Sequence, residues 1–197
     1  MILPNDYDSA KAYSGGGGFD ALPAGGHICK IVGARTTKSR NGNDMIEIAF
    51  DIAEGGEYDG RFQERFNDLR TQKADAKWPN GGMFRTAILN RDGKTSGFFK
   101  GLITSIEESN PGYSFKAAGC NEETLKGKTV GFNFGEEEYK GNDGNLHTAV
   151  KACYAVSVQR VRDGIEPPAK KLYKPSQAEQ MAAQGFTEVD NMPDLPF

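Results

Sequence analysis

Cysteine and histidine are scarce in this 197-residue sequence, which contains three cysteines and two histidines. Cys29, Cys120 and Cys153 are isolated from one another, with no Cys-x-x-Cys pair. An odd number of scattered cysteines argues against a disulfide framework and against a structural zinc site. No histidine cluster, metal-ligand pair or Ser/His/Asp order stands out either. The residues therefore indicate no metal and no cofactor, and they favour a binding protein over an enzyme.

A long apolar run is also missing, and the first residues, Met1-Ile2-Leu3-Pro4, do not resemble a signal peptide. A membrane-spanning helix needs roughly 20 consecutive apolar residues. We therefore expect no membrane partner. Unpaired cysteines are typical of a reducing compartment, so a cytoplasmic protein is the expectation.

A strong positive charge is the third absence. The net charge of −3 argues against a nucleic-acid binder that works by bulk charge alone. The charge is not spread evenly, because residues 27–165 contain 20 Lys and Arg against 19 Asp and Glu, a net charge of +1. The acidic excess lies in the two terminal segments. A nearly neutral domain can still bind DNA through a local basic groove.

The composition divides the chain into three parts. Residues 1–26 are rich in Gly, Asp and Pro, and their run of four glycines lacks the Gly-Lys-Ser/Thr of a phosphate loop, so we expect a flexible N-terminal arm. Residues 27–165 form the expected domain. After Glu166-Pro167-Pro168, residues 166–197 are expected to be a linker and an acidic tail, with a brief helix starting at the capping box Ser176-Gln177-Ala178-Glu179.

Alternation of apolar and polar residues predicts five strands. The second is the most regular, because Ile46, Ile48, Phe50 and Ile52 alternate with polar or small residues. The other predicted strands lie at Ile28–Lys38, around Arg61–Phe66, at Val130–Phe134 and at Val150–Val158. Asn41-Gly42 predicts a hairpin turn after the first strand, and Asp143-Gly144 predicts one in the loop before the fifth.

One amphipathic helix is predicted between the third and fourth strands. Phe99, Leu102, Ile103 and Ile106 follow helical spacing, and Asn110-Pro111-Gly112 ends the segment. Residues 67–94 precede it as a long polar loop insert. Three strands, a helix and two more strands make a mainly β chain, and this order predicts a five-stranded OB-fold barrel with its helix between strands 3 and 4.

Single-stranded DNA binding requires exposed aromatic rings that stack on bases, with Lys and Arg nearby to contact phosphates. The insert offers this combination, the third strand adds a face, and the first and last hairpins add the loops that commonly bind ligands in OB-folds. The candidate nucleic-acid-binding residues are Lys38, Arg40, Arg61, Arg65, Arg70, Lys73, Lys77, Trp78, Phe84, Arg85, Arg91, Tyr139 and Lys140. Stacking is favoured over packing for Trp78, while Phe84 fits either role.

The last ten residues form an acidic segment with two prolines, which disfavour regular structure. Burial of a Phe side chain contributes roughly 1.5–3 kcal/mol, so we expect Phe197 to be captured by a partner. The alternative is an ordinary frayed acidic terminus.

The ending Asp194-Leu195-Pro196-Phe197 matches the Asp-x-Pro-Phe ending of bacterial single-stranded DNA-binding proteins. With the predicted barrel, the chain resembles the phage or prophage type of this family, including the hairpin Lys38–Asn43 and the segment Leu125–Lys128. The resemblance implies protection of single-stranded DNA in phage replication, recombination or repair, in the cytoplasm of a bacterial host cell. It also implies that Asp194, Leu195, Pro196 and Phe197 recruit replication or recombination proteins. Asn191 and Met192 depart from the more acidic family tail.

Two other functional classes stay open. In the first, the domain is a non-catalytic OB-fold module for protein interaction, and the tail is its main functional element. In the second, the protein is a metal-dependent nuclease whose metal is held by the acidic residues Asp51, Glu54, Glu57 and Asp59. The same four residues also fit the solvent-exposed rim of a hairpin.

Overall fold

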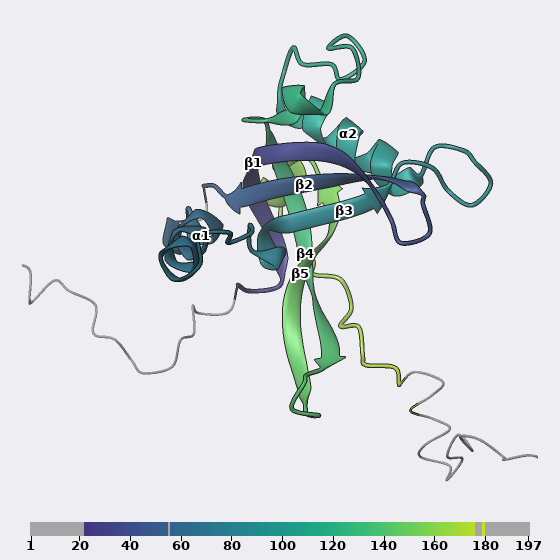
Figure 1. Ribbon diagram of the computed structural model, residues 1–197. Helices are drawn as coiled ribbons and strands as arrows, with labels where there is room; N and C mark the ends of the chain where they lie inside the picture. Colours follow the sequence, from purple (N-terminus) through teal and green to yellow (C-terminus); the bar gives the residue numbers. More distant parts are fainter. Residues whose placement is uncertain (1–21, 55, 176–178, 180–197) are drawn as a thin grey trace, which may run out of the picture.

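The computed structural model describes residues 22–54, 56–175 and 179 (Figure 1). The chain has a mainly β fold whose five strands form one open antiparallel sheet in the order β3-β2-β1-β4-β5. The strands are β1 (Gly25–Lys38), β2 (Asp44–Ile52), β3 (Met83–Ala87), β4 (Thr129–Lys140) and β5 (Leu146–Val156). The helices are α1 (Arg61–Gln72), α2 (Gly97–Ser109) and α3 (Val158–Arg162), with 3-10 turns η1 (Gly56–Tyr58), η2 (Asn80–Gly82) and η3 (Glu122–Leu125). The predicted mainly β class and the helix between the third and fourth strands are confirmed.

The hydrophobic core lies between the curved sheet and α2. The alternating apolar side chains of β2 all point into it, and Phe50 stacks on Phe132 with ring centroids 4.5 Å apart. Leu102 and Ile106 of α2 are fully buried in the same cluster. The spacing of these residues in the sequence is therefore the direct cause of the two-layer packing.

The strand β1 is central in the sheet. It pairs with β2 over most of its length and with β4 through Gly25–Lys30. Its pairing register with β2 shifts between Ile31 and Gly33, and beyond that shift Arg35 lies opposite Glu47. Residues 135–140 of β4 extend beyond Gly25, the first residue of β1, so the β4–β5 hairpin projects from the sheet (Figure 1).

The strand predicted around Arg61–Phe66 is wrong, because this segment forms the first half of α1. Phe62 and Phe66 are four residues apart, a spacing that fits a strand face and a helix face equally well. Leu69 continues the same helical face, and Phe62 is buried there. The four-residue spacing alone does not separate the two periods.

The start of α1 is fixed by a side chain from β2. The carboxylate of Asp51, itself buried, accepts hydrogen bonds from the backbone N–H groups of Phe62 (2.8 Å) and Gln63 (3.0 Å). Gly60, with φ of 70°, turns the chain into the helix. Asp51 therefore satisfies N–H groups that have no partner inside the helix, and its charge is favourable at the N-terminus.

The long loop predicted over residues 67–94 is also wrong. The second half of α1, the turn η2 and the strand β3 occupy most of it. Along β3, Phe84 and Thr86 face the core, while Arg85 lies on the solvent side opposite Glu47. The third strand thus exists, but it lies about twenty residues later in the chain than the alternation around Arg61–Phe66 predicts.

Two more boundaries differ from the sequence-based expectation. The strands β4 and β5 extend into the predicted loop between them, so Tyr139 and Lys140 belong to β4. Val158 begins α3 instead of ending a strand.

Leu22 of the expected N-terminal arm is buried in the core, whereas residues 1–21 lie outside the described part of the chain. None of the described helices is long and apolar enough to cross a membrane.

The segment 166–175, here called the strap, runs along β4. Lys171 forms a parallel bridge with Glu137, supported by backbone hydrogen bonds of 2.8 Å to Glu138 and Glu136. The strap therefore pairs with β4 where β1 has ended, and it covers an edge that would otherwise present unpaired backbone groups. The predicted helix from Ser176 and the tip residues Asp194, Leu195, Pro196 and Phe197 lie outside the described residues.

Candidate nucleic-acid interface

The first cavity lies on the solvent side of β1, β2 and β3. Residues on this face alternate with the core residues, so the side chains of Glu47 and Ala49 point away from Ile48. The cavity has a volume of about 490 Å³. Its lining consists of Gly33, Ala34, Arg35, Glu47, Ala49, Lys77, Trp78, Asn80, Met83 and Arg85.

A charged row crosses the floor of this cavity. Glu47 lies between Arg35 of β1 and Arg85 of β3 in the strand register, and it bonds to both. The Nε of Arg35 donates to Glu47 at 2.7 Å, and the Nε of Arg85 donates to its other carboxylate oxygen. Burial alone would raise the pKa of Glu47, but the hydrogen bonds and charges of Arg85 and Arg35 hold it below the usual value. Glu47 is therefore ionised at neutral pH.

The second cavity lies between α1 and the β4–β5 hairpin. Arg61 and Arg65 are four residues apart on α1, so they share one face of the helix. Tyr139 and Lys151 line the cavity from the hairpin. The volume is about 840 Å³, and the lining consists of Leu22, Arg61, Phe62, Arg65, Leu69, Lys77, Trp78, Pro79, Asn80, Gly81, Tyr139, Thr148, Ala149, Val150 and Lys151.

The two cavities meet at Trp78, with Lys77 and Asn80 beside it. The indole N–H of Trp78 donates to the carbonyl of Gly82 at 3.0 Å, and its ring packs against Phe66 at 5.3 Å. A Cβ at Gly82 would lie 2.6 Å from the indole nitrogen, so the turn η2 requires glycine there. Trp78 is thus held in place by packing and still lines both cavities, and its stacking on a base stays a prediction.

Positive charge gathers in the two cavities, in contrast to the chain as a whole. Their linings hold six cationic side chains: Arg35, Arg61, Arg65, Lys77, Arg85 and Lys151. Glu47 is the acidic residue among the side chains that line them. Lys151 is also paired with Glu137, which lines neither cavity, at 3.0 Å. The joined groove, defined by the residues that line the two cavities, is therefore locally positive in a chain of net charge −3.

The structure brings six of the predicted site residues together and separates the others. Arg61, Arg65, Lys77, Trp78, Arg85 and Tyr139 line the joined groove. Lys38, Arg40, Arg70, Lys73, Arg91 and Lys140 line neither cavity. Lys38 instead pairs with Asp44 at 2.8 Å. Phe84 is 4% exposed and packs on Phe132, so its ring is a core side chain and not a stacking surface.

Sequence reasoning missed several residues that line the groove, among them the charged residues Arg35, Glu47 and Lys151. The alternation in the first two predicted strands places Arg35 and Glu47 on solvent faces, a signal that was available. The pairing of Glu47 with Arg85 depends on the position of β3, which the sequence-based prediction placed elsewhere.

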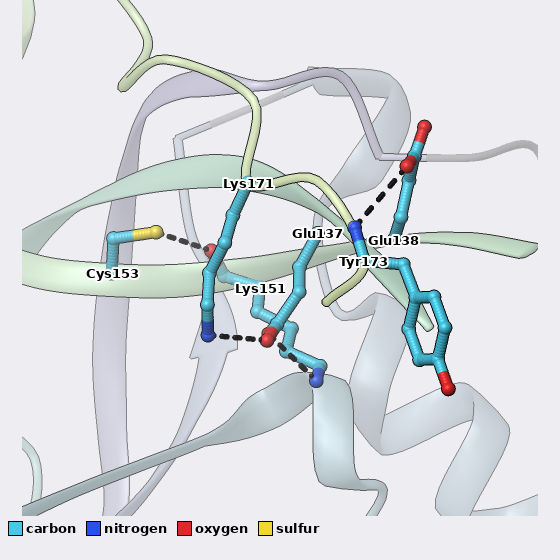
Figure 2. A network of polar contacts seen from close by, with 6 residues as sticks. All are labelled: Glu137, Glu138, Lys151, Cys153, Lys171 and Tyr173. Carbon is cyan, nitrogen blue, oxygen red and sulfur yellow. Dashed lines mark hydrogen bonds and ion pairs between the residues drawn. The ribbon is translucent and has the colours of Figure 1, made fainter. Parts of the chain in front are cut away.

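A second polar network joins the strap to the β4–β5 hairpin (Figure 2). Glu137 accepts hydrogen bonds from Lys171 (2.6 Å) and Lys151 (3.0 Å), and these bonds lower its pKa. Glu138 pairs with Lys170 at 2.9 Å and accepts from the backbone N–H of Tyr173, and its pKa is lowered for the same reason. Lys140 pairs with Glu179. The network holds the strap against the hairpin, and it shares Lys151 with the lining of the second cavity.

The tip of this hairpin predicts a measurable pH dependence. Hydrogen bonds from His147 and Asn145 lower the pKa of Asp143 from 3.8 to about 2. A carboxyl group with a lowered folded-state pKa stabilises the fold above its unfolded pKa, and this contribution is lost as the pH falls toward the folded value. Asp143→Asn is therefore expected to lower the Tm at pH 6 slightly and to converge with the wild type near pH 2. Thermal unfolding followed by circular dichroism checks this, with Asp75→Asn, an exposed aspartate, as the control.

Two of the four acidic residues considered as metal ligands, Asp51 and Glu54, make other contacts. Asp51 caps α1, and Glu54 pairs with Arg162 at 2.7 Å. Within the described ranges, no group of three or more His, Cys, Asp or Glu side chains is arranged to hold a metal ion. The three cysteines are free thiols.

Comparison with known protein families and with curated protein sequences finds no match for this chain.

Proposed function

We propose that the protein binds single-stranded DNA with little sequence preference along the joined groove. The observation that carries this proposal is the groove lining, which combines six cations and one carboxylate with the ring of Trp78. Cations provide phosphate contacts, and an aromatic ring provides a stacking surface for any base. The two cavities share Lys77, Trp78 and Asn80 in their linings, so a strand that passes over Trp78 would contact both.

We also propose that the open sheet is an OB-type barrel. Support comes from the strand order, from α2 between β3 and β4, and from the approach of the edge strands β3 and β5 to each other. OB-folds are partly open barrels that bind oligonucleotides on the face of strands 2 and 3 and with the loop between strands 4 and 5. The first cavity lies on the β2–β3 face, and the second lies against the β4–β5 hairpin.

A titration with labelled oligo-dT at low and moderate salt tests the binding proposal. If about five phosphates contact the groove, the logarithm of the binding constant falls with the logarithm of salt concentration with a slope of about −3.5. Trp78 is the single tryptophan, so its fluorescence reports on the groove in the same titration. Absence of binding at low salt would remove the proposal, and an unchanged fluorescence at saturation would remove the stacking role.

We further propose that the C-terminal tip recruits replication or recombination proteins in a bacterial host, as its resemblance implies. Deleting Asp194, Leu195, Pro196 and Phe197 is then expected to leave the oligo-dT affinity unchanged. Capture of a single-stranded DNA-processing enzyme on DNA coated with the protein should be lost. Equal capture by the full and shortened chains would contradict this role. Cleavage of the oligonucleotide after addition of Mg²⁺ would instead favour the nuclease class.

A further inference from the structure

The three charged side chains of the row Arg35–Glu47–Arg85 differ in their exposure to solvent. The side chain of Glu47 is 8% exposed, whereas those of Arg35 and Arg85 are 72% and 44% exposed. The carboxylate therefore lies beneath two guanidinium groups that face the first cavity. A buried carboxylate is costly unless it is paired and hydrogen-bonded, and here both conditions are met.

The two guanidinium groups keep unused donors. Each carries five N–H donors in a planar fork. Glu47 accepts from the Nε of each arginine, and the Nη2 of Arg35 lies 2.5 Å from the same carboxylate. Among the described residues, Glu47 is the hydrogen-bond acceptor for both the Arg35 and the Arg85 guanidinium group. Two positive charges against one negative charge leave an excess of +1, with free N–H groups directed at the cavity.

We propose that Arg35 and Arg85 form a binding site for one phosphate group of the DNA backbone, and that Glu47 is a positioning residue that holds both guanidinium groups toward it. The inference deepens the proposed function and rests on it. A free arginine side chain loses rotamer entropy when it is immobilised. Glu47 fixes both side chains before the ligand arrives, so binding to phosphate does not carry that cost in full.

The substitution Glu47→Gln separates this role from simple charge attraction, because the two predict opposite signs. Removing one negative charge from the groove would strengthen the binding of a polyanion if bulk charge alone mattered. Loss of the carboxylate instead releases the two arginines, and we expect the Kd for oligo-dT to rise about 3- to 10-fold. Glu108→Gln, an exposed residue of α2 outside both cavities, makes the same charge change as the control and is expected to leave the Kd nearly unchanged or slightly lower.

A second pair of variants keeps the test decisive if Glu47→Gln folds poorly. Arg35→Lys and Arg85→Lys preserve charge at exposed positions but remove the planar fork. Each is expected to raise the Kd about 3-fold or more, and circular dichroism should show an unchanged Tm. Equal or tighter binding by Glu47→Gln, or unchanged binding by both lysine variants, would overturn the phosphate site. Failure of the wild-type protein to bind oligo-dT would instead remove the proposed function itself.

Discussion

Reversing one charge at the junction of the two cavities, with Lys77→Glu, is expected to weaken oligo-dT binding about 10- to 100-fold. Lys77 is exposed and lines both cavities, so its ammonium group lies along any strand that follows the groove. Hydrogen bonds to charged groups contribute about 1.5–3 kcal/mol, and 1.4 kcal/mol corresponds to a tenfold change in affinity. Reversal adds repulsion to the lost attraction.

The matched control for this variant is Lys116→Glu. Lys116 is also exposed, but it lies outside both cavities, and its substitution changes the net charge by the same amount. Fluorescence anisotropy at two salt concentrations measures both variants, and the Tm of each should match the wild type. A similar loss of affinity in the two variants would mean that overall charge governs binding, and the groove would lose its role.

Replacing Asp51 by alanine is expected to lower the free energy of unfolding by about 3 kcal/mol. Its carboxylate accepts three backbone N–H groups, those of Ile52, Phe62 and Gln63. Each buried N–H group left without a partner costs about 1–3 kcal/mol, and the helix also loses a negative charge at its N-terminus. Urea denaturation followed by circular dichroism measures the change.

Asp51→Asn and Asp75→Ala complete this experiment. Asn keeps one oxygen acceptor, so its loss of stability should be smaller than that of alanine. Asp75 is exposed, and its replacement should change stability by less than about 0.5 kcal/mol. A wild-type unfolding curve for Asp51→Ala would show that α1 does not depend on this cap. Binding gives a second readout, because a displaced α1 would carry Arg61 and Arg65 away from the second cavity.

The elements that could be predicted are those whose pattern is local and repeated. Four alternating apolar residues predict β2, and the spacing from Phe99 to Ile106 predicts α2. In both segments the periodicity of the apolar residues identifies the buried face. The prediction therefore does not depend on the element that packs against it.

The helix α1 could not be assigned in this way. The Phe62 and Phe66 pair fits two periods, and the cap that favours the helix comes from Asp51, eleven residues earlier and on another element. A strand predicted around Arg61–Phe66 completes the five strands of an OB-fold, so the sequence pattern did not require a further strand at β3. Tertiary contacts decided a segment whose local pattern is ambiguous.

The candidate site shows the same division. Residue types pointed to Lys77, Trp78 and Arg85, since cations and an aromatic ring in a polar segment are readable from sequence. The partnership of Arg85 with Glu47 and Arg35 depends on the register of three strands, which no short pattern specifies. Phe84, one residue away from Arg85, faces the core because side chains alternate along β3.

The direction of the strap determines where the last residues start, and their number determines how far they can reach. It runs parallel to β4, so the chain leaves the domain heading toward the hairpin tip near Lys140. Residues 176–197, even fully extended, span at most about 75 Å. A protein tethered at Phe197 would share a sphere of that radius with the bound DNA, an effective concentration on the order of 1 mM. A partner with only micromolar affinity of its own for DNA would then occupy the strand almost fully.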